Sequence, residues 1–145
     1  MAEDTRLLMC PENVVPGTTL GPIFYIVSAE QISRFRLAMD RKNSVHLNRQ
    51  AHLAPPTMRL QDYALLISSV FRGGSGGIHA SHKSEFYEPM RVGQAIKTEG
   101  RIVRTYTNRG KFFFELEYES KDAVTDALMV RHVITSVLLR SDGAR

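Results

Sequence analysis

The sequence has little of several features that would place it in a specialised class of protein. Cys10 is its only cysteine, so no internal disulfide can form, and a lone cysteine favours a reducing compartment. The first residues, MAEDTRLLMC, are acidic early and lack the apolar stretch of a signal peptide. The most apolar segment is too short and too polar at its start to cross a membrane. We therefore expect a cytoplasmic protein without a membrane partner.

Charge of one sign is not concentrated anywhere along the chain. The 145 residues include 19 Lys and Arg and 15 Asp and Glu, which gives a net charge of +4. A basic balance can favour nucleic acid, but the basic side chains are scattered and no nucleic-acid-binding motif is present, so we predict no nucleic-acid partner. The length and the 43% hydrophobic content fit one domain with a single core. We expect one domain over residues 1–145, with flexible ends at 1–13 and 141–145.

The segment 55–74, PPTMRLQDYALLISSVFRGG, is the strongest helix signal in the chain. Prolines precede it and glycines follow it, which suits the first turn and the end of a helix. Its apolar residues cover more than one narrow stripe. The pattern predicts one long helix that is buried on most sides.

Strand and helix patterns surround this segment. Residues 1–21 are predicted as loop and 22–27 as a strand. Ser28 is a predicted N-cap with Gln31 as its capping-box partner. The helix that it starts should bury one face, formed by Ile32, Phe35, Leu37, Ala38 and Met39. After the long helix the patterns predict four strands, at 81–88, 95–107, 111–120 and 126–140.

The last two strands indicate the architecture. In 111–120 the apolar residues fall on one face and the glutamates on the other, whereas the centre of 126–140 is apolar on both faces. A strand covered on both sides lies mid-sheet or at a subunit interface. The order of elements predicts the α+β class, with a curved antiparallel sheet of about five strands wrapped around one long central helix. This is the hot-dog architecture, and we expect a dimer that gives the outer strands partners.

The polar loop 40–54 is the candidate for chemistry, because a polar loop that leads into a buried helix often carries function. It contains Asp40, Asn43 and His46. A histidine can exchange a proton near neutral pH, and a nearby carboxylate can share that work. No histidines and carboxylates fall at metal-ligand spacing, so we predict no metal site. The glycines of 73–77 lack the Lys-Ser/Thr pair of a phosphate-binding loop.

The remaining histidines are given no role in this prediction, and His132, in an apolar strand, is predicted to be a core side chain. No Gly-x-Ser-x-Gly motif is present and Cys10 has no evident helper, so a covalent nucleophile is not expected.

Three stretches in order resemble the MaoC-like family of hydratases and dehydratases. The family has a loop of the form Asp-x-Asn-Pro-Ile-His, an Ala-Pro-Pro-Thr-Phe helix opening in its N-terminal-type domains, and a Phe-x-x-Pro-Val-x-x-Gly-Asp strand end and turn. The matching positions here are Asn43, Ser44, Val45, His46, Asn48 and Ala51, then Ala54, Pro55, Pro56, Thr57 and Met58, then the segment 85–94. The resemblance runs over nearly the whole chain, from about residue 14 to residue 139.

This resemblance implies reversible addition of water to an enoyl thioester of coenzyme A or an acyl-carrier protein, without a cofactor. Asp40 and His46 would be the catalytic pair, and Asn43 would help to orient the reactants. The Thr57 backbone N–H would bind the thioester oxygen at the helix start, where N–H groups lack partners, with Met58 beside it. Asp40 lies one residue farther from His46 than in the family pattern.

Two other functions remain open at this point. Some members of the family lack the catalytic pair and act as partners in a heterodimer, so this chain could instead shape an acyl-binding tunnel for a catalytic subunit. A hot-dog thioesterase would need a carboxylate near the helix start, and Asp62 is the nearest one on the helix. The expected partners are therefore an acyl thioester and a second hot-dog subunit, which can be a copy of this chain or a relative.

Overall fold

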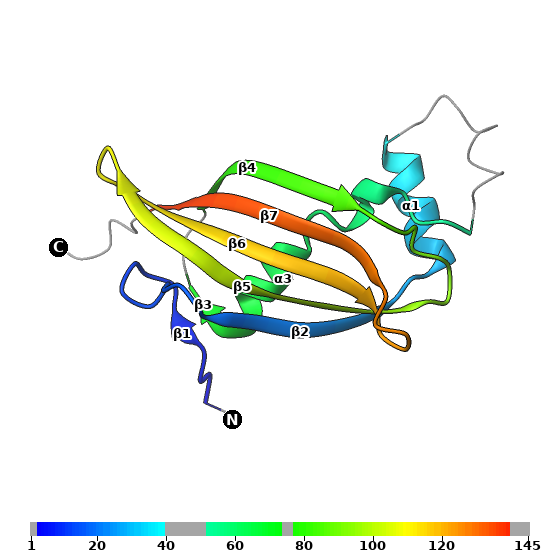
Figure 1. The fold of residues 1–145 in the computed structure, drawn as a ribbon, viewed down its shortest axis with the longest axis horizontal. Coiled ribbons are helices and arrows are strands. Elements are labelled where there is room, and N and C mark those ends of the chain that lie inside the picture. The colour runs from blue at the N-terminus through cyan, green and yellow to red at the C-terminus, as the bar shows by residue number, and fades with distance from the viewer. Residues whose placement is uncertain (1–2, 40–51, 74–76, 140–145) are drawn as a thin grey trace.

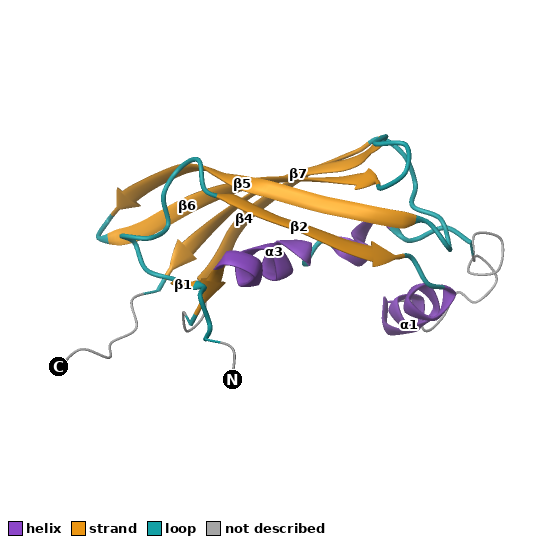
Figure 2. Cartoon of the chain, turned by 90° about the horizontal axis from the view of Figure 1, so that it is seen from below, coloured by secondary structure: helices purple, strands orange, loops and turns teal. Residues whose placement is uncertain are grey.

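A five-stranded antiparallel sheet in the order β2-β5-β6-β7-β4 forms the body of the protein (Figure 1). The computed structural model describes residues 3–39, 52–73 and 77–139. The strands are β2 (Thr19–Ile26), β4 (Gly77–Phe86), β5 (Ala95–Asn108), β6 (Lys111–Asp122) and β7 (Leu128–Leu138). The helical elements are α1 (Ala29–Met39), the 3₁₀ turn η1 (Pro56–Arg59) and α3 (Asp62–Val70). The helices lie under one face of the curved sheet, so the predicted architecture is confirmed (Figure 2).

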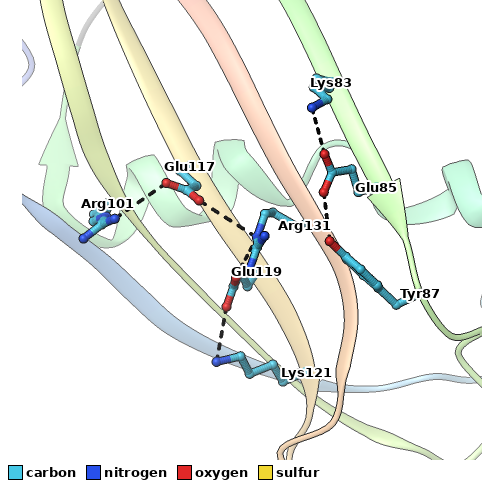
Figure 3. A network of polar contacts seen from close by, with 8 residues as sticks. All are labelled: Lys83, Glu85, Tyr87, Arg101, Glu117, Glu119, Lys121 and Arg131. Carbon is cyan, nitrogen blue, oxygen red and sulfur yellow. Dashed lines mark hydrogen bonds and ion pairs between the residues drawn. The ribbon is translucent and has the colours of Figure 1, made fainter.

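The alternation in β6 decides which face of the sheet is the core. Phe114, Leu116 and Tyr118 are buried in the main core cluster beneath the sheet. The glutamates between them point to the opposite face, where Glu117 and Glu119 form ion pairs with Arg131 of the neighbouring strand (Figure 3). Because these charges lie on the face away from the helices, they need no burial, and the predicted assignment of faces is confirmed.

The central helix is shorter than predicted. The segment forms the 3₁₀ turn η1 and then a separate helix, α3, of nine residues. The hydroxyl of Tyr118 donates a hydrogen bond to the Leu60 carbonyl at 3.1 Å. The Ala64 N–H instead bonds the Gln61 carbonyl at 3.0 Å, three residues back along the chain. The sheet therefore contacts the chain at the point where the α-helical hydrogen-bond pattern is interrupted.

The prediction that this helix is buried on most sides is wrong. Only Asp62 and Leu66 are buried in α3, and Leu65 is 53% exposed. The helix packs mainly on β2 and β5, and a Cβ on Gly21 of β2 would meet Leu66 at 2.8 Å. Because α3 lies toward one side of the sheet, its other faces are left open.

Helix α1 begins as predicted but buries less of its surface. The Gln31 N–H donates to the Ser28 hydroxyl at 3.1 Å, which confirms the N-cap. Ile32 is the only buried residue of α1, whereas Leu37 and Met39 are exposed. Helix α1 lies beyond the end of α3, at one end of the sheet (Figure 2), so most of its apolar face has no part of the described chain to pack against.

Strand boundaries differ modestly from the predictions. Within the stretch predicted as loop, Leu7–Leu8 form β1, which pairs in parallel with β3 (Phe71–Arg72), and β2 already begins at Thr19. Arg109 and Gly110 have φ values of 49° and 72° in a two-residue hairpin loop between β5 and β6. Strand β7 lies between β6 and β4, which confirms the mid-sheet alternative of the two that its pattern predicts. None of the described helices is long and apolar enough to cross a membrane.

Candidate active site

The predicted catalytic residues Asp40 and His46, and Asn43 between them, lie outside the described residues. The structure describes the chain on both sides of their loop. Helix α1 ends at Met39 before it. After it, the Leu53 carbonyl accepts a hydrogen bond from Arg36 Nη2 at 2.9 Å. The segment that leaves the loop is therefore tied directly to α1.

Two further backbone hydrogen bonds fix the chain as it leaves the loop. The Val92 N–H donates to the His52 carbonyl at 2.9 Å, and the Ala54 N–H donates to the Met90 carbonyl at 2.8 Å. These bonds join the approach to the helix start with the turn after β4. The second and third stretches of the sequence resemblance, Ala54–Met58 and 85–94, are thus neighbours in space.

A cavity of about 210 Å³ lies where these segments meet. We call it the helix-start cavity. Its lining comes from the helix approach, from the end of β4 with the turn after it, and from the facing part of β7: Ala54, Pro55, Pro56, Arg59, Phe86, Tyr87, Glu88, Pro89, Met90, Val130 and His132. Most of these side chains are apolar, and a few polar groups lie among them. Such a lining suits an apolar ligand that is oriented by a small number of polar contacts.

The predicted substrate-binding residues Thr57 and Met58 lie on η1. Thr57 is exposed, and Met58 is half-buried and packs against the core cluster that contains Val27 and Ile32. The N–H groups of a first helical turn have no acceptor within the helix. Because α3 begins only at Asp62, the donor at Thr57 belongs to a short 3₁₀ turn, and the dipole of α3 acts from farther along the chain than predicted.

A buried ion pair holds this turn against the sheet. Arg59 Nη2 lies 2.8 Å from Asp62 Oδ1, and Arg59 Nε donates to Asp62 Oδ2 at 3.1 Å. The guanidinium carbon of Arg59 lies 3.6 Å from the centre of the Tyr25 ring, within cation–π range. Burial raises the pKa of Asp62, and the charge of Arg59 acts against that rise. Burial also raises the pKa of Tyr25, to about 12.

Histidines that sequence reasoning left without a role gather on the inner face of β4 and β7. His132 is buried as predicted, at 2% exposure. Its Nδ1 lies 2.8 Å from Ser84 Oγ and 3.0 Å from His82 Nε2. The Tyr118 ring stacks on the His132 ring with centroids 4.5 Å apart. Burial first, and then the neighbouring His82, lowers the pKa of His132 to about 4.

The contacts of His82 and Ser84 with His132 depend on the pairing of β4 with β7. The spacing of His82 and Ser84 in a strand places both on one face, which the sequence does show. The register that sets Ser84 opposite His132 comes from strand pairing. Among the described residues, no group of three or more His, Cys, Asp or Glu side chains is arranged to hold a metal ion.

Comparisons with known proteins identify the fold. No family model matches the sequence, and no curated protein matches it. Among solved structures, a MaoC-like dehydratase from Rhodospirillum rubrum superposes with a TM-score of 0.70 at 16% identity, covering 90% of this chain and 97% of that one.

Two further structures match equally well. The C-terminally truncated HadBC complex, a (3R)-hydroxyacyl-ACP dehydratase from Mycobacterium tuberculosis, has a TM-score of 0.70 at 16% identity, covering 85% of this chain and 96% of that one. The R-hydratase PhaJ1 from Pseudomonas aeruginosa has a TM-score of 0.70 at 12% identity, covering 90% and 85%. At these identities the comparisons establish the hot-dog fold, and they carry no residue roles over to this chain.

Proposed function

We propose that this hot-dog protein is a hydratase or dehydratase that adds water to, or removes it from, the double bond of an enoyl thioester of coenzyme A or an acyl-carrier protein. The helix-start cavity is the observation that carries this proposal. Ala54 lines it, and this residue follows closely in the chain after the loop that contains Asp40, Asn43 and His46. Its largely apolar lining suits an acyl chain.

The proposed chemistry combines residues of the loop before the helix start with residues of η1, where Thr57 and Met58 lie next to the cavity-lining residues Pro56 and Arg59 in sequence. In hydration, the water oxygen bonds to the β-carbon and a proton is delivered to the α-carbon, while negative charge builds on the thioester oxygen. Asp40 and His46 hold the water and transfer the protons, and Asn43 orients them. The Thr57 N–H on η1 donates to the thioester oxygen, where preorganised donors contribute strongly to catalysis, and Met58 contacts the substrate.

The test is turnover of crotonyl-coenzyme A by the purified chain, followed by loss of the enoyl-thioester absorbance. His46→Ala and Asp40→Ala should each reduce the rate by about a hundredfold or more, as loss of a general acid or base does. His52→Ala is the matched control, because its side chain is exposed and its backbone carbonyl makes the contact with Val92. Wild-type rates in both catalytic variants would overturn the site assignment.

The second candidate is a non-catalytic subunit that binds acyl chains for a partner. The HadBC structure is a complex by its name, and the open faces of α3 and α1 in this chain leave apolar side chains such as Leu65 and Leu37 uncovered among the described residues. Under this candidate the pure chain binds acyl-coenzyme A but leaves crotonyl-coenzyme A unchanged.

The thioesterase candidate rests on Asp62, but in the structure this carboxylate forms an ion pair with Arg59. It is 3% exposed and both of its oxygens contact Arg59. A carboxylate held in this way is poorly placed to attack a thioester or to activate water. Release of free coenzyme A from acyl-coenzyme A would nevertheless restore this candidate, and a thiol reagent detects it in the same assay.

We further propose that the chain forms a dimer through β4. This ten-residue strand is an edge of the sheet and pairs only with β7 in the described chain. Ile78 near its start is about half exposed. An edge with apolar side chains is a ready site for pairing with another strand. The partner is a second copy of this chain or a related hot-dog subunit, and light scattering on the pure protein distinguishes the two.

A further inference from the structure

His132 is the most deeply buried side chain in the lining of the helix-start cavity, and we call its position the cavity floor. The residues at the cavity mouth, Phe86 to Pro89, are exposed, whereas His132 is 2% exposed and comes from β7 inside the sheet. Pro55, Met90 and Val130 are among the apolar side chains that line the same cavity. An imidazole is thus a polar group at the bottom of a mainly apolar space.

The nitrogen of His132 that meets this space is Nε2. Nδ1 makes both hydrogen-bond contacts of the ring, to Ser84 Oγ and His82 Nε2, and no described residue is a hydrogen-bond partner of Nε2. None of the fully buried side-chain nitrogens and oxygens in the described chain lacks a partner, so Nε2 must be open to a cavity. Because His132 lines the helix-start cavity, we infer that Nε2 faces this cavity.

The ring is also held in a fixed position. Ser84 and His82 restrain Nδ1, the Tyr118 ring stacks on one side, and the Phe86 ring lies edge-on at 6.3 Å. Burial keeps the pKa of His132 near 4, so the imidazole is uncharged at neutral pH. A fixed neutral imidazole offers one donor or one acceptor at Nε2, according to its tautomer.

We propose that the helix-start cavity binds a short acyl group that carries an uncharged oxygen, such as a hydroxyl, on one of its last carbons, apart from the carbons that react. His132 Nε2 recognises this oxygen by a hydrogen bond. The acyl class of the ligand rests on the proposed function, whereas the oxygen follows from the polar atom at the cavity floor. His132 is then a specificity-determining residue for the substrate. A plain hydrocarbon chain leaves Nε2 buried and without a partner, which is unfavourable.

The volume of the cavity and the chemistry of its lining both limit which ligands can bind. A volume of about 210 Å³ lies below the roughly 300–1,000 Å³ that is typical of pockets for small-molecule ligands. This fits a short acyl chain rather than a long one. A hydroxyl both donates and accepts, so it satisfies Nε2 in either tautomer. A carboxylate lacks a paired cation here, because the nearest one in the lining, Arg59, is already bound to Asp62.

The experiment measures binding without turnover. The ligands are saturated hexanoyl-coenzyme A and three analogues, each with one hydroxyl on a different one of the last three carbons. Each ligand is titrated into the wild-type protein by calorimetry. At least one hydroxylated analogue should bind about tenfold tighter than hexanoyl-coenzyme A, because it pairs a buried polar atom that the plain chain leaves unpaired. Equal affinity for all four ligands would overturn the proposal.

Two matched variants test whether His132 is the recognising group. His132→Gln places an amide group near the position of Nε2, whereas His132→Asn reaches only the position of Nδ1, next to Ser84 and His82. Both replace the ring by a smaller amide, so their melting temperatures should be similar. The preference for the hydroxylated analogue should survive in the Gln variant and fall to about onefold in the Asn variant. A preference that is undiminished in His132→Asn would refute the role of Nε2.

If the amide variants do not fold, Ser84→Ala is the alternative test. It removes the shorter of the two hydrogen bonds that position the ring, so the preference for the hydroxyl should fall severalfold while affinity for hexanoyl-coenzyme A stays unchanged. An unchanged preference would count against the proposal. If the protein prefers the hydroxylated ligand but does not turn over crotonyl-coenzyme A, this inference stands and the hydratase proposal fails. If it turns over crotonyl-coenzyme A but shows no preference for the hydroxyl, the hydratase proposal stands and this inference fails.

Discussion

The buried pair of Arg59 and Asp62 gives a prediction whose magnitude follows from the structure. Replacing Arg59 by Met keeps most of the side-chain volume and removes the charge that faces the Asp62 carboxylate. Breaking a buried pair by removing one partner costs about 3–5 kcal/mol, because the other charge stays buried. Arg59 retains 19% side-chain exposure, so water reaches the site and we expect about 3 kcal/mol.

Replacing the other partner of the pair, Asp62, should lower the free energy of unfolding by less. Asp62→Leu leaves Arg59, whose long side chain can move toward solvent from its partly exposed position. The Asp62→Leu, Arg59→Met double variant should be close to Asp62→Leu alone, because two apolar side chains can replace a buried pair with little loss. Arg34→Ala is the control, since Arg34 pairs with Glu30 on the exposed face of α1 and exposed pairs contribute about 0.2–1 kcal/mol at most.

The pH dependence has a defined sign. Burial raises the pKa of Asp62 above its unfolded value, and loss of Arg59 removes the charge that opposes this rise. A group with a raised folded pKa favours the folded state at low pH and loses that contribution as pH rises through the folded pKa. The free energy of unfolding that Arg59→Met loses relative to wild type should therefore be largest at neutral pH. This loss should shrink as pH falls toward the unfolded pKa of Asp62.

Urea unfolding followed by circular dichroism at neutral and acidic pH measures both effects. In thermal unfolding, a loss of about 3 kcal/mol corresponds to a fall in melting temperature of roughly 10 °C for a chain of this size. A loss at neutral pH no larger than that of Arg34→Ala would refute the claim that the pair is buried. A deficit that grows as pH falls would refute the assignment of the charge to Asp62.

Further predictions concern the core, the N-cap, the catalytic pair and the assembly. Phe114→Ala should lower the free energy of unfolding by about 3–5 kcal/mol, since Phe114 is 2% exposed; an unchanged melting temperature would contradict the assignment of sheet faces. Ser28→Ala should cost about 1 kcal/mol through loss of the bond from the Gln31 N–H, visible as a lower urea midpoint. Combining Asp40→Ala with His46→Ala should cost little activity beyond the worse single change, because groups that act together are not additive; full additivity in crotonyl-coenzyme A turnover would mean that they act separately. Ile78→Lys on β4 should shift light scattering toward monomer, and a dimer that persists would place the interface elsewhere.

Several elements were predictable because their signals are local. The alternation of Phe114, Leu116 and Tyr118 with glutamates sets the faces of β6. Ser28 caps α1 through a bond to a residue in the first turn of that helix, and the Arg109–Gly110 hairpin depends on the conformations of its own two residues. The order of these elements then leaves few ways to arrange them, and the hot-dog prediction is confirmed.

The candidate site was predictable in part. The sequence resemblance singled out the helix opening and the segment 85–94, and the structure brings these together at one cavity. Asp40, Asn43 and His46 lie outside the described residues, and their roles stay predictions. The neighbourhood of His132, Ser84 and His82 was not predictable, because a histidine in an apolar strand gives no indication of which residues lie opposite it.

The sequence by itself determined the identity and order of the main elements, since hydrogen-bond capping, turn conformation and hydrophobic periodicity depend on residues a few positions apart. Only the tertiary structure decided where the central helix breaks, at Leu60, whose carbonyl accepts a hydrogen bond from Tyr118 of the sheet. It also decided that α3 and α1 each leave an apolar side open, and that β4 sets Ser84 and His82 beside His132. These outcomes depend on partners distant in the chain, and only folding brings such partners within contact distance.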